Sequence, residues 1–284
     1  MPIRFCVNAQ KMRFLPRACY WHGGLAQQCQ LIIDLPVAVV AAAIAPGTID
    51  LRTSELMPAH DAEKLTISVD DTHRVSALMR LPPAARACYV LAHGAGAGMT
   101  HPSLEAIASG LGERGIATLR YQFPYMEKGS KRPDAPALAH ATVRAAVAEA
   151  SRRVPELALI AGGKSFGGRM TSQAQAASPL AGVRGLAFLG FPLHPAGRPA
   201  ADRGEHLLEV RIPMLFLQGT RDALAELALL RTLVERLGEV ATLRLFQDAD
   251  HSFHVPARTG RKDSDVRREL LGALAEWISS VAAR

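Results

Sequence analysis

The sequence predicts an α/β fold with a mostly parallel central sheet and helices on both faces. Two observations carry this prediction. From Lys64 onward, short apolar runs alternate with stretches of helical periodicity. Several of these runs are continuously apolar, which is typical of parallel strands buried on both faces. Parallel α/β sheets hold their sites at the carboxyl ends of the strands, so we searched the residues that follow each apolar run for functional side chains.

The elements follow one another in a regular order. Residues 64–69 and 74–81 alternate like half-buried strands, and the Asp-rich turn DDTH joins them. Further strands are expected at 88–92, 116–121, 157–161, 184–189, 213–218 and 242–246, with helices at 102–114, 135–153, 166–177, 223–237 and 266–281. About twenty residues separate the strand at 184–189 from the next one, too few for a cap domain, which needs at least ~50 residues.

Composition excludes several classes of function. The 284 residues are 49% hydrophobic and 21% charged, as in ordinary globular proteins. The net charge of +7 comes from scattered basic residues, so we expect a solvated surface and no nucleic-acid partner. The four cysteines show no C-x-x-C spacing, and we expect neither a metal, a cofactor nor a disulfide framework.

The first 56 residues differ from the rest of the chain. Basic residues precede an apolar run at Leu35–Ala45, but Asp34 adjoins this run and its 11 residues are too few to span a bilayer. We expect residues 1–56 to be a poorly ordered extension and residues 57–284 to form one cytoplasmic domain without a membrane partner. A signal-like or membrane-associating segment is the alternative for this region.

The stretch LALIAGGKSFGGRM contains two overlapping motifs. A phosphate-binding loop of the form G-x-x-x-x-G-K-[ST] needs a glycine at position 158, but Ala158 stands there, inside an apolar run. The motif G-x-S-x-G fits as Gly163 to Gly167, between a strand and a helix. Ser165 is therefore predicted to be a nucleophile in a sharp turn, the alternative being a helix cap.

A serine nucleophile needs a histidine base and a carboxylate that orients the base. Asp222 and His251 each follow a predicted strand, which gives the chain order Ser, Asp, His. His254 is an alternative base. Asp248 and Asp250 are alternative acids, although both adjoin the histidine on its own loop.

The developing oxyanion needs two N–H donors, which we assign to the backbone of Phe166 and Ala95. Gly96 is expected to contact the substrate, and His93 to hold the loop HGAGAGM as a structural residue. Three side chains are further candidates for substrate contact: Tyr125, Lys164 and Arg169. Tyr125, like Tyr121 and Phe123, has core packing as its alternative, and the two basic residues have packing or salt bridging as theirs.

Six segments together resemble a known family: LAHGAGAGMTHP, LRYQFPYMEKGSKRPD, GGKSFGGRM, FLGFPLHP, LQGTRD and DADHSF. They look like the small, capless branch of the α/β-hydrolase superfamily, which is similar to dienelactone hydrolases. Its eukaryotic relatives include a testis-expressed protein and a chromatin-complex subunit. The resemblance covers about residues 60–284 and implies the α/β-hydrolase fold and the triad Ser165, Asp222 and His251. Dienelactone hydrolases carry a cysteine where this chain has Ser165, so lactone specificity is not implied.

We therefore expect a serine hydrolase that cleaves small ester or thioester substrates through an acyl-enzyme. A non-catalytic interaction protein on the same fold is the alternative, because relatives of this branch serve as complex subunits. Peptidase activity is disfavoured, since it normally needs an enclosing cap or propeller that the chain lacks.

Overall fold

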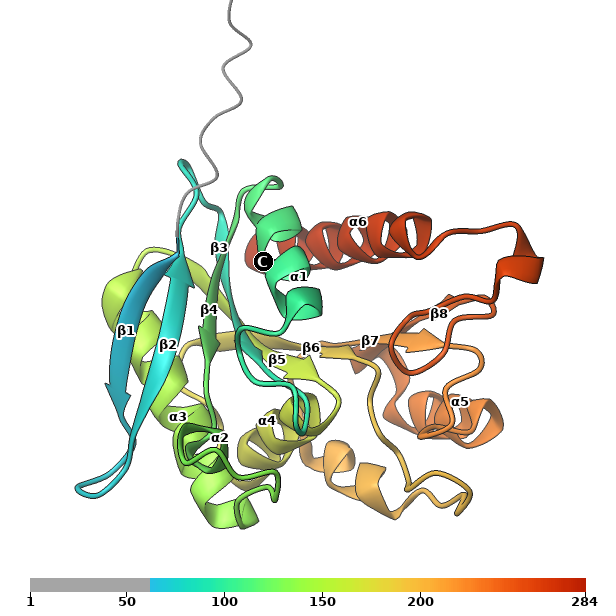
Figure 1. Cartoon of the computed structure of the whole chain (residues 1–284), viewed down its shortest axis with the longest axis horizontal. Helices are drawn as coiled ribbons and strands as arrows, with labels where there is room; N and C mark the ends of the chain where they lie inside the picture. Colours follow the sequence, from blue (N-terminus) through green and yellow to red (C-terminus); the bar gives the residue numbers. More distant parts are fainter. Residues whose placement is uncertain (1–61) are drawn as a thin grey trace, which may run out of the picture. The chain divides into compact units, whose positions relative to one another are not determined.

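The computed structural model describes residues 62–284, so the expectations for residues 1–56 lie outside the described residues. An eight-stranded sheet runs through this part of the chain in the order β1-β2-β4-β3-β5-β6-β7-β8 (Figure 1). The strands are β1 (Glu63–Ser68), β2 (Arg74–Arg80), β3 (Ala87–Ala92), β4 (Ile116–Tyr121), β5 (Ala158–Lys164), β6 (Val183–Leu189), β7 (Met214–Gly219) and β8 (Ala241–Phe246).

Strand direction follows the hydrophobic pattern of the sequence. The alternating strands β1 and β2 pair antiparallel at one edge, and β2 also runs antiparallel to β4. The other neighbouring pairs are parallel. Every residue of β3, β4 and β7 is buried, as expected for strands covered on both faces. The predicted mostly parallel sheet is confirmed.

Helices cover both faces of the sheet (Figure 1). On one face, α3 (Pro136–Arg153), α4 (Phe166–Ala177) and α5 (Leu227–Leu237) share a core with the sheet. On the other, α1 (Pro102–Gly112) and α6 (Asp263–Ala282) form a second core. Each fully buried Leu or Ile in these cores contributes about 1.5–3 kcal/mol relative to an exposed one. Within residues 62–284, no helix combines the length and apolarity that crossing a membrane requires.

Short helices complete the described chain: α2 (Pro124–Glu127), η2 (Asp202–Glu209), η3 (Gly238–Val240) and η4 (Ala257–Thr259). Between β6 and β7, residues 190–213 contain η2 and connecting loop. This segment is not a domain, so the prediction of a fold without a substantial cap is confirmed.

Several element boundaries differ from the prediction, and two of them lie next to the predicted site residues. Helix α5 begins at Leu227 and not at residue 223, because residues 223–226 form a turn in which the Leu224 N–H donates to the Asp222 carboxylate. Strand β5 extends through the glycines to Lys164 instead of ending at residue 161. Glycine usually weakens a strand, but here its small size permits close contact with both neighbouring strands.

The glycines of β5 mark the closest contacts of the sheet. Gly163 has a φ of 152°, and a Cβ atom built on it would lie 2.3 Å from the Ala92 carbonyl oxygen of β3. A Cβ on Gly162 would lie 1.9 Å from the Ala187 carbonyl oxygen of β6. Both positions need glycine, because an alanine would force two backbones apart.

We predict that Gly163→Ala lowers the free energy of unfolding by about 3 kcal/mol or more, since β3 and β5 must separate to admit a methyl group. The matched control is Gly272→Ala on the exposed side of α6, where no atom lies within 4 Å of the new Cβ. That substitution should stabilise the protein by up to about 1 kcal/mol through helix propensity. Urea denaturation measures both effects, and equal stability of the two variants would contradict the prediction.

Candidate active site

Ser165 lies in a strained turn between β5 and α4. Its φ of 51° and ψ of −116° are unusual for a residue with a Cβ and cost about 1–3 kcal/mol. The Ser165 N–H donates to the Leu189 carbonyl of β6, and its hydroxyl does not cap the helix that it precedes. A Cβ on Gly167 would lie 2.5 Å from the His93 carbonyl oxygen, so the turn packs directly against the loop after β3. Because the Ser165 hydroxyl does not cap the helix, it is available to bond to another partner.

That partner is His251. The two side chains lie at hydrogen-bond distance, with 2.8 Å between Ser165 Oγ and His251 Nε2. On the other side of the ring, His251 Nδ1 lies 2.7 Å from Asp222 Oδ2. The carboxylate cannot donate, so the proton is on Nδ1 and Nε2 is left to accept from the serine. The structure thus brings together the three residues that the sequence singled out, in the order that base catalysis needs.

Asp222 is held by two further donors. Gln218 Nε2 donates to Asp222 Oδ2 at 2.5 Å, and the Leu224 N–H donates to Oδ1 at 2.8 Å. Gln218 is fully buried, and its own oxygen accepts from the Phe191 N–H at 2.9 Å. This role of Gln218 was not among the predictions from the sequence. Its signal was a polar residue at the buried end of the apolar run MLFLQG.

The alternative acid and base residues are engaged elsewhere. His254 pairs with Asp263 of α6 at 2.8 Å, an interaction that raises the pKa of His254. Asp250 Oδ1 accepts from the backbone N–H groups of Ser252 and His254. Within the described residues, neither Asp250 nor Asp248 bonds to His251. These residues shape the turn that carries His251.

His93 supports the loop at residues 93–99, as predicted. Its Nδ1 donates to the Gly94 carbonyl at 2.8 Å, and its Nε2 accepts from the Phe123 N–H at 3.1 Å. The ring is fully buried, and burial lowers its pKa. A neutral imidazole satisfies both hydrogen bonds, so His93 has a structural role.

Residues of β4, of α2 and of the segment between them support the same loop. The Gly96 N–H donates to the Tyr125 hydroxyl at 3.3 Å, and the Met99 N–H donates to Gln122 Oε1 at 2.8 Å. Buried Arg120 donates to the Met99 carbonyl at 3.2 Å. Tyr121, Phe123 and Tyr125 are all buried. The structure therefore places Tyr125 beneath the loop, in contact with the backbone of Gly96.

Two backbone N–H groups near Ser165 have no acceptor among the described residues. One belongs to Phe166, the first residue of α4, where the helix dipole favours negative charge. The other belongs to exposed Ala95 in the loop after β3. A Cβ on the adjacent Gly94 would lie 3.7 Å from Ser165 Cβ, which brings the loop up to the serine. Both groups can donate to an oxygen bound at Ser165.

Lys164 lies beneath the loop that carries His251. Its ammonium donates to the His251 carbonyl and lies 5.2 Å from the centre of the Phe253 ring. A Cβ on Gly190 would come within 2.8 Å of the ammonium, so a glycine there leaves room for it. Burial lowers the pKa of Lys164 to about 8, against the opposing charges of Asp222 and Asp250. The lysine thus anchors the backbone of the histidine.

Arg169 lies one turn along α4 from Ser165, and its N–H donates to the Ser165 carbonyl at 3.1 Å. Its Nε is buried without a hydrogen-bond partner. In the described part of the chain, no three His, Cys, Asp or Glu side chains gather as a metal site would require.

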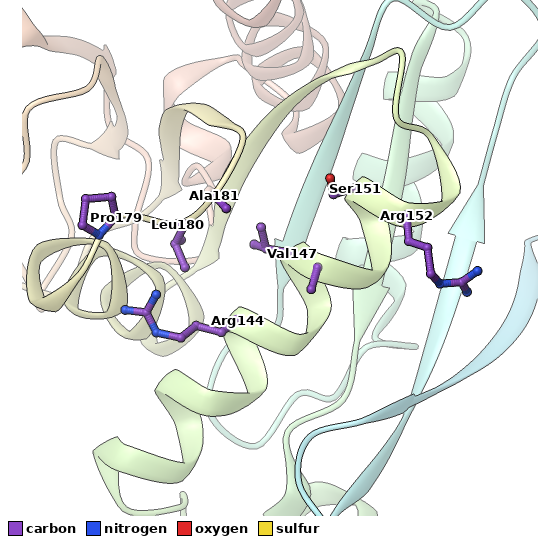
Figure 2. A pocket seen from close by; sticks show the side chains of 8 residues that line it. Arg144, Val147, Ser151, Arg152, Pro179, Leu180 and Ala181 are labelled. Carbon is purple, nitrogen blue, oxygen red and sulfur yellow. The ribbon is translucent and has the colours of Figure 1, made fainter.

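A separate hollow lies between α3 and the segment after α4 (Figure 2). Its volume is about 460 Å³, and its lining includes Val147, Leu180 and Arg144. Arg144 is occupied there, because it donates to the carbonyls of Ala174 and Ser178. None of the predicted site residues lines this hollow.

Comparisons with known proteins agree with this architecture. Residues 85–279 match the model of a family described as an alpha/beta hydrolase domain. Among solved structures, the chain is similar to a dienelactone hydrolase from Anabaena variabilis, with 19% identity, a TM-score of 0.61, and coverage of 77% of this chain and 97% of that one. A serine hydrolase without lid from Xanthomonas campestris is 22% identical, with a TM-score of 0.60 and coverage of 76% of this chain and 95% of that one. The esterase domain of a Rhodothermus marinus protein is 18% identical, with a TM-score of 0.60 and coverage of 77% of this chain and 98% of that one. At these identities the likeness shows the fold.

The pKa of Lys164 leads to a prediction about pH. Below about pH 8 the ammonium is charged and donates strongly to the His251 carbonyl, and above it the donation weakens. The rate at which a fluorophosphonate labels Ser165 should therefore fall as pH rises through 8. Lys164→Met should lower the rate at pH 7 about tenfold, equivalent to about 1.4 kcal/mol, and abolish this alkaline decline.

Lys64→Met, on exposed β1, is the control and should behave like the unchanged protein. An alkaline decline that persists in Lys164→Met would assign it to another group.

Proposed function

The chain belongs to the alpha/beta hydrolase domain family, whose model matches residues 85–279, and on this premise we propose that it is a serine hydrolase that cleaves small ester or thioester substrates. The expected likeness to the capless, dienelactone-hydrolase-like branch is confirmed. One observation carries the proposal: the hydrogen-bonded series from Ser165 through His251 to Asp222, which begins at a strained turn. The proposed enzyme is cytoplasmic, with a small molecule as its partner.

Acylation is the first half of the reaction. His251 Nε2 takes the proton of the Ser165 hydroxyl as the serine oxygen bonds to the acyl carbon. The carbonyl π electrons move to the oxygen, which becomes an oxyanion. When the tetrahedral intermediate collapses, the bond to the leaving group breaks, and His251 returns its proton to the departing alcohol or thiol. Asp222 stabilises the imidazolium throughout.

Deacylation repeats these steps with water. His251 removes a proton from a water molecule, the resulting hydroxide bonds to the acyl carbon, and Ser165 leaves with the proton from His251. The products are the free acid and the original enzyme. Because alcohols and thiols leave by the same route, one site serves esters and thioesters.

The oxyanion is stabilised in both halves by the N–H groups of Phe166 and Ala95. Each has no acceptor within the described residues, so neither must break a protein hydrogen bond to bind the substrate oxygen. Removal of one such donor in serine hydrolases typically costs about 2.7–4 kcal/mol. Hydrogen bonds from Gly96 to Tyr125 and from Met99 to Gln122 hold the loop in place.

Substrate size follows from what surrounds the serine. Between β6 and β7 the described chain inserts no cap domain, since residues 190–213 contain only η2 and loop. Without a cap, little apolar surface is available to bind a long acyl chain. We therefore propose short or polar acyl groups as substrates.

We predict that a fluorophosphonate labels Ser165, and that peptide mass spectrometry locates the adduct there. Ser165→Ala should lose the label and lower kcat/KM towards p-nitrophenyl acetate by about 10³-fold or more, because the covalent route is lost. Among p-nitrophenyl esters, acetate and butyrate should exceed octanoate in kcat/KM.

Circular dichroism controls for folding of each protein. Folded protein that neither labels nor turns over these esters would reject the proposed hydrolase and favour a non-catalytic interaction protein on this fold.

A further inference from the structure

Four basic side chains gather around α4, the helix that follows Ser165. They are His140 of α3, Arg169 of α4, and Arg203 and His206 of η2, and we refer to them as the basic cluster. Helix α4 contacts both α3 and η2, and Figure 1 shows it beside α3. Because α4 begins at Phe166, directly after Ser165, Arg169 lies about one helical turn from the proposed nucleophile.

Hydrogen bonds fix the two histidines on either side of Arg169. The Ser172 hydroxyl donates to the Arg169 carbonyl at 2.9 Å and lies 2.7 Å from His206 Nε2, which must then be the donor. His140 Nε2 lies 3.3 Å from the oxygen of Gln173. Both imidazoles are therefore held by side chains of α4, and neither pairs with the Arg169 guanidinium.

Among the described residues, none pairs with the guanidinium of Arg169. Its Nε is buried without an acceptor, and none of its nitrogens makes a hydrogen bond or ion pair within the described residues. Leaving a buried donor unsatisfied is destabilising, and more so when the group is charged. Arginine cannot relieve this cost by losing its proton. A bound acceptor would offset it.

The charges around Arg169 have one sign. Burial, and then the charge of Arg203, lowers the pKa of Arg169. Burial lowers the pKa of His206 to about 4, with Arg169 and His140 adding to the effect. The carboxylate of Glu205 on η2 is paired with Arg236 at 2.9 Å. Within the described residues no ion pair forms between Arg169 or Arg203 and any carboxylate, so the cluster presents an uncompensated positive field.

We propose that Arg169, assisted by Arg203, binds an oxyanion group that the substrate carries in addition to its scissile ester or thioester. This inference rests on the proposed function and names its substrate class. The planar guanidinium matches the two oxygens of a carboxylate or a phosphate. Four helical residues rise about 6 Å, so the anion lies a few bonds from a carbonyl held at Ser165. Side chains on helices lean towards the N-terminus, which is the end of α4 that adjoins Ser165.

Three matched esters test this proposal. Mono-p-nitrophenyl adipate ends in a carboxylate, p-nitrophenyl 5-phosphonopentanoate ends in a phosphonate, and p-nitrophenyl hexanoate ends in a methyl group. The unchanged protein should prefer one of the anionic esters over the neutral one about tenfold or more in kcat/KM. The preferred anion identifies the source of the charge, carboxylate or phosphate.

Arg169→Met should reduce this preference about tenfold, because it keeps the apolar stem and removes the charge. Arg169→Lys should retain part of the preference, since the ammonium keeps the charge but lacks the planar fork. Arg152→Met removes a largely exposed arginine of α3, which pairs with Glu149, and is the matched control that should keep the full preference.

The outcomes separate the two proposals. Ser165 labelling by a fluorophosphonate with equal rates for anionic and neutral esters, or with a preference that Arg169→Met leaves intact, would overturn the anion site alone. Absence of labelling in folded protein would instead reject the hydrolase. If Arg169→Met does not fold, the ester preference of the unchanged protein and the partial effect of Arg169→Lys decide the question.

Discussion

The positive φ of Ser165 is the constraint on which the candidate site depends. The turn is held between two close contacts, since Gly163 packs against the Ala92 backbone and Gly167 against the His93 carbonyl. These contacts stabilise a conformation that would otherwise cost about 1–3 kcal/mol. The same packing brings the loop after β3 close to the serine, where a Cβ on Gly94 would lie 3.7 Å from Ser165 Cβ. Close backbone packing therefore positions Ser165 and the loop after β3 relative to each other.

Polar groups in the buried sheet then fix the other two members of the series. Gln218 at the end of β7 orients Asp222, and Lys164 at the end of β5 holds the backbone of His251. A buried glutamine and a buried lysine are costly unless they are satisfied. Both are satisfied by the neighbouring residues that they position, which explains their presence at the carboxyl edge of the sheet. The basic cluster beside α4 differs, because no residue in 62–284 pairs with its central arginine.

Local sequence patterns predicted most of the sheet, its helices and the positions of Ser165, Asp222 and His251. These features depend on residues close together in the chain, such as the apolar run before the turn at Gly163–Gly167 or the Asp that follows β7. The start of α5 and the role of Gln218 were not predicted, because both depend on the hydrogen bonds that the Asp222 carboxylate accepts in the folded protein. The burial of Tyr125 under Gly96, 29 residues away in sequence, also follows from tertiary packing.

A crystal structure of the phosphonylated protein would show which side chain reacts and where the oxyanion is bound. After a fluorophosphonate reacts, the adduct carries a tetrahedral phosphorus whose free oxygen occupies the place of the oxyanion. We predict phosphorus bonded to Ser165 Oγ, with that oxygen about 2.7–3.1 Å from the N–H groups of both Phe166 and Ala95. Phosphorus on another residue, or an oxygen directed away from both N–H groups, would contradict it.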